Sequence, residues 1–160
     1  MAEVIHKYPQ VTLVNLNSGG EEYLVNLKAL VKREIQYNMP LGGILSCFDL
    51  GASGLTCPQA NVTPRSYREF VDHYERKEFD KMAPIHAGLV RFKKLSERWH
   101  PGNVRWVKMA WKILKLPGGE GGVREPYVLP AADQIKQFED AMPGVGLPEL
   151  DELLRAAKSR

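Results

Sequence analysis

The stretch NVRWVKMAWKILKLPGG, residues 103–119, combines two tryptophans and four cations with a run of apolar residues. As a helix it places its four cations within one narrow stripe, because successive residues turn by about 100°. As a strand it places Lys108 and Lys112 on one face beside Trp106, and its Val, Ile and Trp residues favour that state. The pattern leaves residues 104–116 open between helix and strand.

A basic block surrounds this stretch. Residues 86–116 hold eight Lys or Arg against the single acid Glu97, whereas the whole chain of 160 residues carries a net charge of only +3. The eight cations are Arg91, Lys93, Lys94, Arg98, Arg105, Lys108, Lys112 and Lys115. A local excess of one charge indicates a surface for an anionic partner. It is equally typical of a solubilising face whose aliphatic stems cover apolar side chains.

The first half of the chain predicts strands. Residues 11–17 are apolar and β-branched and end at Asn-Ser-Gly-Gly, which is typical of a strand and a turn. Residues 21–35 fit a strand pairing back on 11–17, the interpretation we favour, or a helix. Residues 44–48 fit a short buried strand. A capping box and apolar residues at helical spacing predict an amphipathic helix over 66–82, ending before a proline.

The second half predicts more helix. Residues 87–99 fit a strand or a helix, and a strand there would form a hairpin with 104–116. The glycines of 118–122 predict a flexible loop, and two helices are expected at 131–142 and 148–158. The expected fold is therefore α+β, with a small antiparallel sheet, the amphipathic helix near 66–82 and two C-terminal helices. We expect a single domain, 1–160, whose C-terminal helical segment is 131–160.

Catalytic and metal-binding patterns are weak. The four histidines lack the spacing of a zinc site, the two cysteines do not imply a disulfide framework, and no cofactor motif is complete. Asp49-Leu50-Gly51-Ala52 resembles the active-site strand of the retropepsin-like aspartic proteases, but Leu50 stands where that family needs a hydroxyl. The sequence therefore predicts no catalytic residue, metal or cofactor. The absence of a leader-like or membrane-spanning segment predicts a cytoplasmic protein, or a virion protein if viral.

The predicted function is interaction rather than catalysis. We expect a non-enzymatic protein that presents its basic, tryptophan-bearing centre to nucleic acid, where cations neutralise phosphates and aromatic rings stack on bases. The expected binding residues are Lys93, Lys94, Arg98, Arg105, Lys108, Lys112, Trp99 and Trp106. The alternative is a self-associating structural protein of the viral matrix or coat type, a homo-oligomer that contacts membrane lipid or genome. An anionic membrane or an acidic protein surface are further candidate partners, and an enzyme with a dispersed site is the remaining class.

Overall fold

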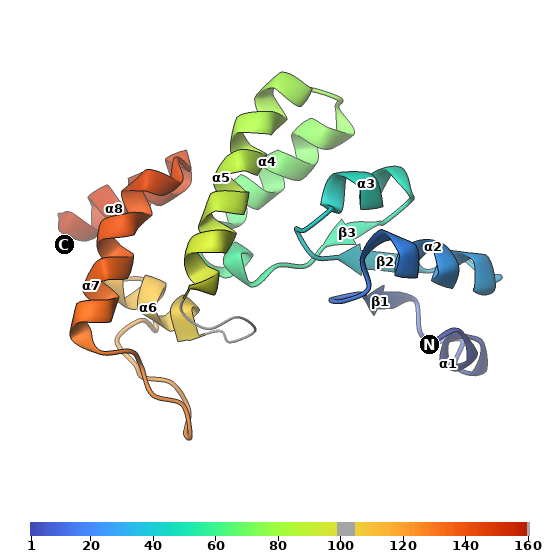
Figure 1. Ribbon diagram of the computed structural model, residues 1–160, viewed down its shortest axis with the longest axis horizontal. Coiled ribbons are helices and arrows are strands. Elements are labelled where there is room, and N and C mark those ends of the chain that lie inside the picture. Colours follow the sequence, from blue (N-terminus) through green and yellow to red (C-terminus); the bar gives the residue numbers. More distant parts are fainter. Residues whose placement is uncertain (99–104, 160) are drawn as a thin grey trace. The chain divides into compact units, whose positions relative to one another are not determined.

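The chain forms two compact units, residues 1–57 and residues 58–160 (Figure 1). The computed structural model describes residues 1–98 and 105–159. Within these residues, no helix has the length and apolar character needed to cross a bilayer. The expectation of one domain over the whole chain stays a prediction, and each unit is described by itself.

The first unit alternates helices and short strands. Its elements are α1 (Ala2–Lys7), β1 (Leu13–Asn15), α2 (Gly20–Leu30), β2 (Gln36–Met39), α3 (Ile44–Asp49) and β3 (Gly54–Leu55). The strands form one sheet in the order β1-β2-β3, and both pairs are parallel. The predicted antiparallel sheet is therefore wrong, because α2 and α3 each return the chain to start the next strand in the same direction.

The helix α2 replaces the strand that we favoured over 21–35. Gly19 precedes it with a φ of 96°, a left-handed conformation that glycine adopts without steric cost. Leu24 and Leu27 then fall on one face at helical spacing and are buried, whereas the alternating set that a strand would bury includes the exposed Tyr23 and Val25. The predicted strand at 44–48 is likewise helical, as α3.

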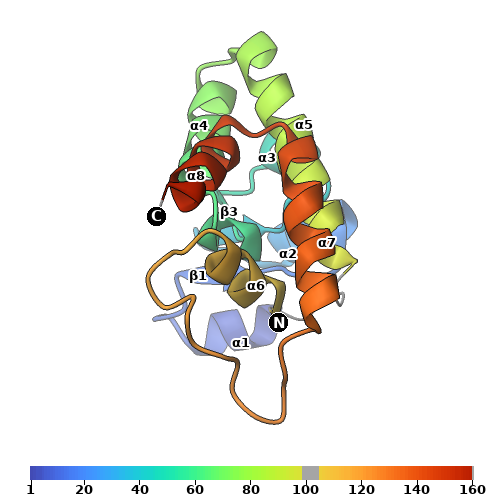
Figure 2. The same ribbon diagram turned by 90° about the vertical axis from the view of Figure 1, so that its left-hand side faces the viewer.

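The second unit is helical. It contains the 3₁₀ turn η1 (Pro58–Asn61), α4 (Pro64–Glu75), α5 (Phe79–Glu97), α6 (Arg105–Ile113), α7 (Ala132–Ala141), the 3₁₀ turn η2 (Met142–Val145) and α8 (Pro148–Lys158). Figure 2 shows α4 and α5 side by side, with α8 beside α4. The two C-terminal helices lie where the sequence predicts them. Residues 118–122 form turns, and their flexibility stays a prediction.

The predicted helix 66–82 is in fact parts of two helices. The chain turns between α4 and α5, where Lys77 has a φ of 58°. The second helix then continues through Pro84, which is exposed to solvent. Proline within a helix costs about 3 kcal/mol, and the burial of Leu89 and Phe92 further along α5 offsets that cost.

The central basic segments are helices rather than a hairpin. Most of 87–99 belongs to α5, and 104–116 includes α6. The buried residues of α6 are Trp106, Met109 and Ala110, which follow the helical spacing i, i+3, i+4. Trp106 meets the ring of Phe92 edge-on, with ring centroids 5.7 Å apart. The cations of α6 therefore lie on the side of the helix that faces solvent, opposite its buried side.

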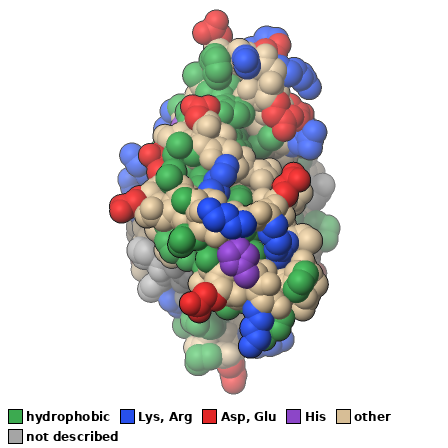
Figure 3. Space-filling model, turned by 90° about the vertical axis from the view of Figure 1, so that its right-hand side faces the viewer, with side chains coloured by type: hydrophobic (Ala, Val, Ile, Leu, Met, Phe, Trp, Pro, Cys, Tyr) green, Lys and Arg blue, Asp and Glu red, His purple; other side chains and the backbone are tan. Residues whose placement is uncertain are grey.

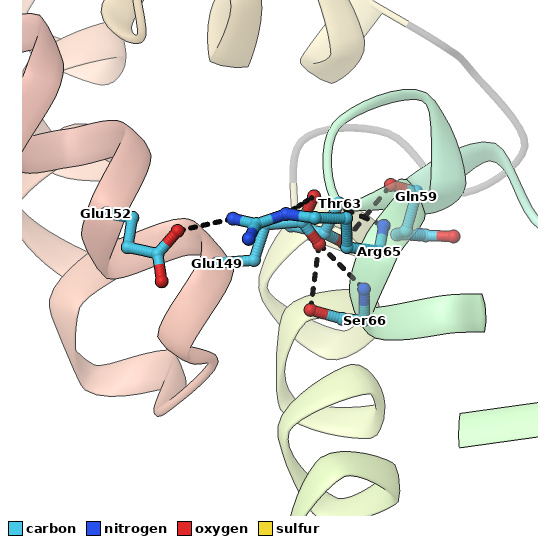
Figure 4. Close-up of polar contacts among 6 residues, drawn as sticks. All are labelled: Gln59, Thr63, Arg65, Ser66, Glu149 and Glu152. Carbon is cyan, nitrogen blue, oxygen red and sulfur yellow. Dashed lines mark hydrogen bonds and ion pairs between the residues drawn. The ribbon is translucent and has the colours of Figure 1, made fainter. Parts of the chain in front are cut away.

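A buried carboxylate joins α8 to the start of α4 (Figure 4). Glu149 accepts hydrogen bonds from the Ser66 backbone N–H at 2.8 Å, the Ser66 hydroxyl at 2.9 Å and the Arg65 backbone N–H at 3.2 Å. The Arg65 guanidinium also pairs with the exposed Glu152. The first N–H groups of a helix lack partners within the helix, so Glu149 serves as the cap of α4.

Candidate active site at the carboxyl edge of the sheet

The carboxyl ends of the three parallel strands gather polar side chains. Asn15, Asn38 and Gly54 face one another in register across β1, β2 and β3. On the opposite face the strands bury Val14, Tyr37 and Met39, so the row lies on the more exposed face of the sheet. In parallel α/β sheets, ligands bind outside the carboxyl ends of the strands. We therefore define Asn15, Asn38 and Thr56 as the carboxyl-edge cluster.

A hydrogen bond and a glycine position the side chains of this cluster. The Thr56 hydroxyl, which follows β3 directly, donates a hydrogen bond to Oδ1 of Asn15 at 3.1 Å. A Cβ at Gly54 would lie 2.4 Å from Oδ1 of Asn38, so glycine leaves the room that the Asn38 amide occupies. Amides and a hydroxyl donate and accept hydrogen bonds without changing charge near neutral pH. The cluster is therefore suited to orienting a polar substrate rather than to transferring its protons.

The loops that leave the strands bring a carboxylate to the same edge. Glu21 stands in the first turn of α2, just after the Asn-Ser-Gly-Gly loop, and its Oε1 lies 3.4 Å from the position of a Cβ at Gly43, before α3. Burial raises the pKa of the Cys47 thiol in α3, and the negative charge of Glu21 raises that pKa further. Cys47 is thus held as a neutral thiol, which is a poor nucleophile.

The opposite, amino side of the sheet carries cations that the sequence analysis did not single out (Figure 3). Lys28 donates to the carbonyl oxygen of Leu50 at 2.8 Å, and Arg33 donates to the carbonyl oxygen of Ile5 at 3.0 Å. Arg33 also bonds the carbonyl oxygens of Tyr8 and Val11. These cations satisfy backbone carbonyls, so they stabilise the unit, as is typical of the amino side of parallel α/β folds.

The predicted nucleic-acid residues on α5 separate into two groups. Lys93 pairs with Glu97, one helical turn away. Lys94 and Arg98 project instead toward a hollow that they share with Arg91. Trp99 lies outside the described residues.

Three of the four predicted residues on α6 are engaged within their own unit. Arg105 donates to the carbonyl oxygen of Val128 at 3.2 Å, and Lys108 donates to that of Gly118 at 3.0 Å. Lys112 is exposed. Trp106 is only 4% exposed, so its ring is not available for stacking on a base. Of the seven predicted residues that the structure describes, one is in an ion pair, two bond backbone carbonyls, one is in the core, two line a hollow and one is exposed.

Metal binding finds no support in the described residues, where no three His, Cys, Asp or Glu side chains gather as a ligand set.

Comparison with known proteins gives similarity to one kind of enzyme. No family model matches the chain. A curated 4-hydroxy-tetrahydrodipicolinate synthase from a strain of Methanococcus maripaludis is 24% identical over 163 residues, covering 90% of this chain and 55% of that protein. The same enzyme from another strain is 30% identical over 103 residues, which are 64% of this chain and 34% of that protein. The chain thus spans about a third to a half of the length of these relatives.

Solved structures agree with the sequence relatives. Dihydrodipicolinate synthase from Aquifex aeolicus has a TM-score of 0.76 at 17% identity, covering 92% of this chain and 50% of that one. The fold is that of about half a dihydrodipicolinate synthase. A putative dihydrodipicolinate synthase family protein from Coccidioides immitis gives a TM-score of 0.75 at 20% identity and covers 94% of this chain. These neighbours are barrels of the TIM type, in which parallel strands alternate with helices.

These comparisons overturn the functional prediction. The curated relatives and the solved neighbours are named as enzymes, so the predicted non-enzymatic nucleic-acid-binding protein is wrong. The viral matrix or coat alternative is wrong too, as are the predicted membrane and acidic-protein partners. Self-association stays a prediction. The sequence did hold a signal for the candidate site. Strand 11–17 ends at polar and glycine residues followed by a helical pattern, which is the signature of a βα unit.

Proposed function

We propose that this chain is part of an enzyme of the dihydrodipicolinate synthase type and that its carboxyl-edge cluster binds the small-molecule substrate. The observation that supports this role most directly is the pairing of Asn15 with Asn38 across the two strands, together with the hydrogen bond from Thr56 to Asn15. It lies at the end of the sheet where enzymes of this fold bind their ligands. The relatives' names add the class of product, because dipicolinate is a small dicarboxylate.

The chemistry of the cluster fits the recognition of carboxylate and carbonyl oxygens. Asparagine amides offer N–H donors to such oxygens, and the Thr56 hydroxyl holds the Asn15 amide by its oxygen. That bond engages the oxygen of the amide and not its N–H groups, which can donate to a ligand. Orientation of a substrate by fixed donors lowers the entropic cost of reaction. The cytoplasmic location expected from the sequence suits such an enzyme and stays a prediction.

A binding experiment with dipicolinate (pyridine-2,6-dicarboxylate) tests this proposal. We expect titration into the ¹⁵N-labelled chain to shift the backbone amide signals of the carboxyl-edge cluster. Thr56→Val removes the hydroxyl that holds Asn15 and keeps the shape of the side chain. Loss of one hydrogen bond worth about 0.5–1.5 kcal/mol should weaken binding roughly 2- to 10-fold.

The matched control is Thr12→Val, an exposed threonine at the amino end of β1. It removes an identical hydroxyl from the far end of the same sheet and should leave the dissociation constant unchanged. A folded chain whose carboxyl-edge signals do not move with dipicolinate, or two valine variants that weaken binding equally, would refute the proposed site.

A further inference from the structure

The hollow that Lys94 and Arg98 share with Arg91 lies wholly within the helical unit, between α5 and the η2 turn. Its volume is about 270 Å³, close to the lower end of the range of small-molecule pockets. The residues that line it are Arg91, Lys94, Leu95, Arg98, Ala141, Gly144 and Val145. Three of these are cations and none is an acid. We call this the α5 hollow.

The first cation of the α5 hollow is fixed by its surroundings. Nε of Arg91 donates to the carbonyl oxygen of Val145 at 2.7 Å, which ties the guanidinium to η2. Gly146 follows with a φ of 69°, and a Cβ there would lie 3.0 Å from Nη2 of Arg91. Glycine therefore gives the guanidinium its room. Because the guanidinium is already anchored, its remaining N–H groups can donate hydrogen bonds to a ligand with little further loss of side-chain entropy.

The other two cations have no partner among residues 1–98 and 105–159. Within the part of the chain that the structure describes, neither Lys94 nor Arg98 has a hydrogen-bonded side chain or an ion pair. Lys93 provides the contrast, because it stands on the same helix and pairs with Glu97. Like charges that converge without a counter-charge repel one another, and an anion in the hollow would relieve that repulsion.

The spacing of the cations indicates the kind of anion. Arg91, Lys94 and the C-cap residue Arg98 follow one another at three and four residues, so they lie along one face of α5 and its C-terminal end. Seven residues of helix span about 10 Å along the axis, which is more than one phosphate or carboxylate covers. We propose that the α5 hollow binds a small molecule with two anionic groups, each a carboxylate or a phosphate. This site lies in the second unit and is separate from the carboxyl-edge cluster, so either proposal can fail alone.

Two probes distinguish the chemical source of the anion. Inorganic pyrophosphate represents phosphate ligands, and succinate represents dicarboxylates. Each is titrated into the whole chain at low ionic strength by calorimetry, with ¹⁵N-detected shifts to locate the site. We expect at least one probe to bind, with shifts centred on Arg91, Gly144 and Val145. The double variant Lys94→Gln, Arg98→Gln should weaken that binding about 10-fold or more, because it removes two charge-assisted hydrogen bonds.

The control is Lys112→Gln, which removes an exposed cation of α6 that does not line the hollow. It should leave the affinity within about 2-fold of the parent. A melting temperature equal to that of the parent chain would confirm that each variant is folded. The proposal is overturned if neither probe binds the folded chain, if the shifts map outside the hollow, or if the control loses as much affinity as the double variant.

Discussion

Replacement of Glu149 by glutamine should destabilise the helical unit substantially. The carboxylate accepts three hydrogen bonds at the start of α4, and its side chain is only 8% exposed. A glutamine has one oxygen, so an N–H group must face at least one of these donors. Losing a hydrogen bond to a charged group costs about 1.5–3 kcal/mol. Losing the negative charge at a helix N-terminus adds about 0.3–1 kcal/mol.

The expected loss in the free energy of unfolding is therefore about 2–4 kcal/mol. Chemical denaturation followed by far-ultraviolet circular dichroism measures it. Glu152→Gln is the matched control, because Glu152 pairs with the same Arg65 from an exposed position. Exposed ion pairs contribute roughly 0–1 kcal/mol. Equal effects of the two substitutions, or a loss below about 1 kcal/mol for Glu149→Gln, would refute the assignment of Glu149 as the buried cap of α4.

Two further predictions concern α5 and the turn before it. A hydrogen bond from Lys81, which has the larger effect, and a second one from His73 lower the pKa of Glu78 to about 2. Because this folded pKa lies below the ordinary value of 4.5, the stabilisation is present above pH 4.5 and is lost as the pH falls toward 2. Melting temperatures of Glu78→Gln and the parent should differ at pH 7 and converge near pH 2, and a constant difference would contradict this. Gly88→Ala should cost about 1–3 kcal/mol in urea denaturation, because its Cβ would lie 2.6 Å from Cδ2 of Leu147. Gly144→Ala, with open space around it, should be far milder.

Local patterns predicted the C-terminal helices well. Residues 148–158 begin with proline and acids and end with Arg155 and Lys158, and α8 has the same bounds. The helix that was one of the two alternatives for 104–116 is also present, as α6. These signals lie within one helix and depend on neighbours three or four residues away, so a sequence shows them directly.

The sheet was mispredicted because its direction depends on contacts between segments far apart. The strands are only two to four residues long, too short for alternation to show. A glycine pair before residue 21 fits a hairpin and a helix start equally, and the choice was decided by the packing of Leu24 and Leu27. Once the strands are parallel, their carboxyl ends meet at one edge, and the functional candidates become Asn15, Asn38 and Thr56 rather than the basic block.

The direction of the sheet is therefore the claim on which the candidate site depends. Its most direct test is a set of nuclear Overhauser contacts between backbone protons of β1 and β2 in the labelled chain. A parallel pair should show contacts that advance together, from Leu13 with Gln36 to Asn15 with Asn38, across strands about 4.8 Å apart. Contacts that run in opposite directions along the two strands would show an antiparallel pair and would contradict the carboxyl-edge site.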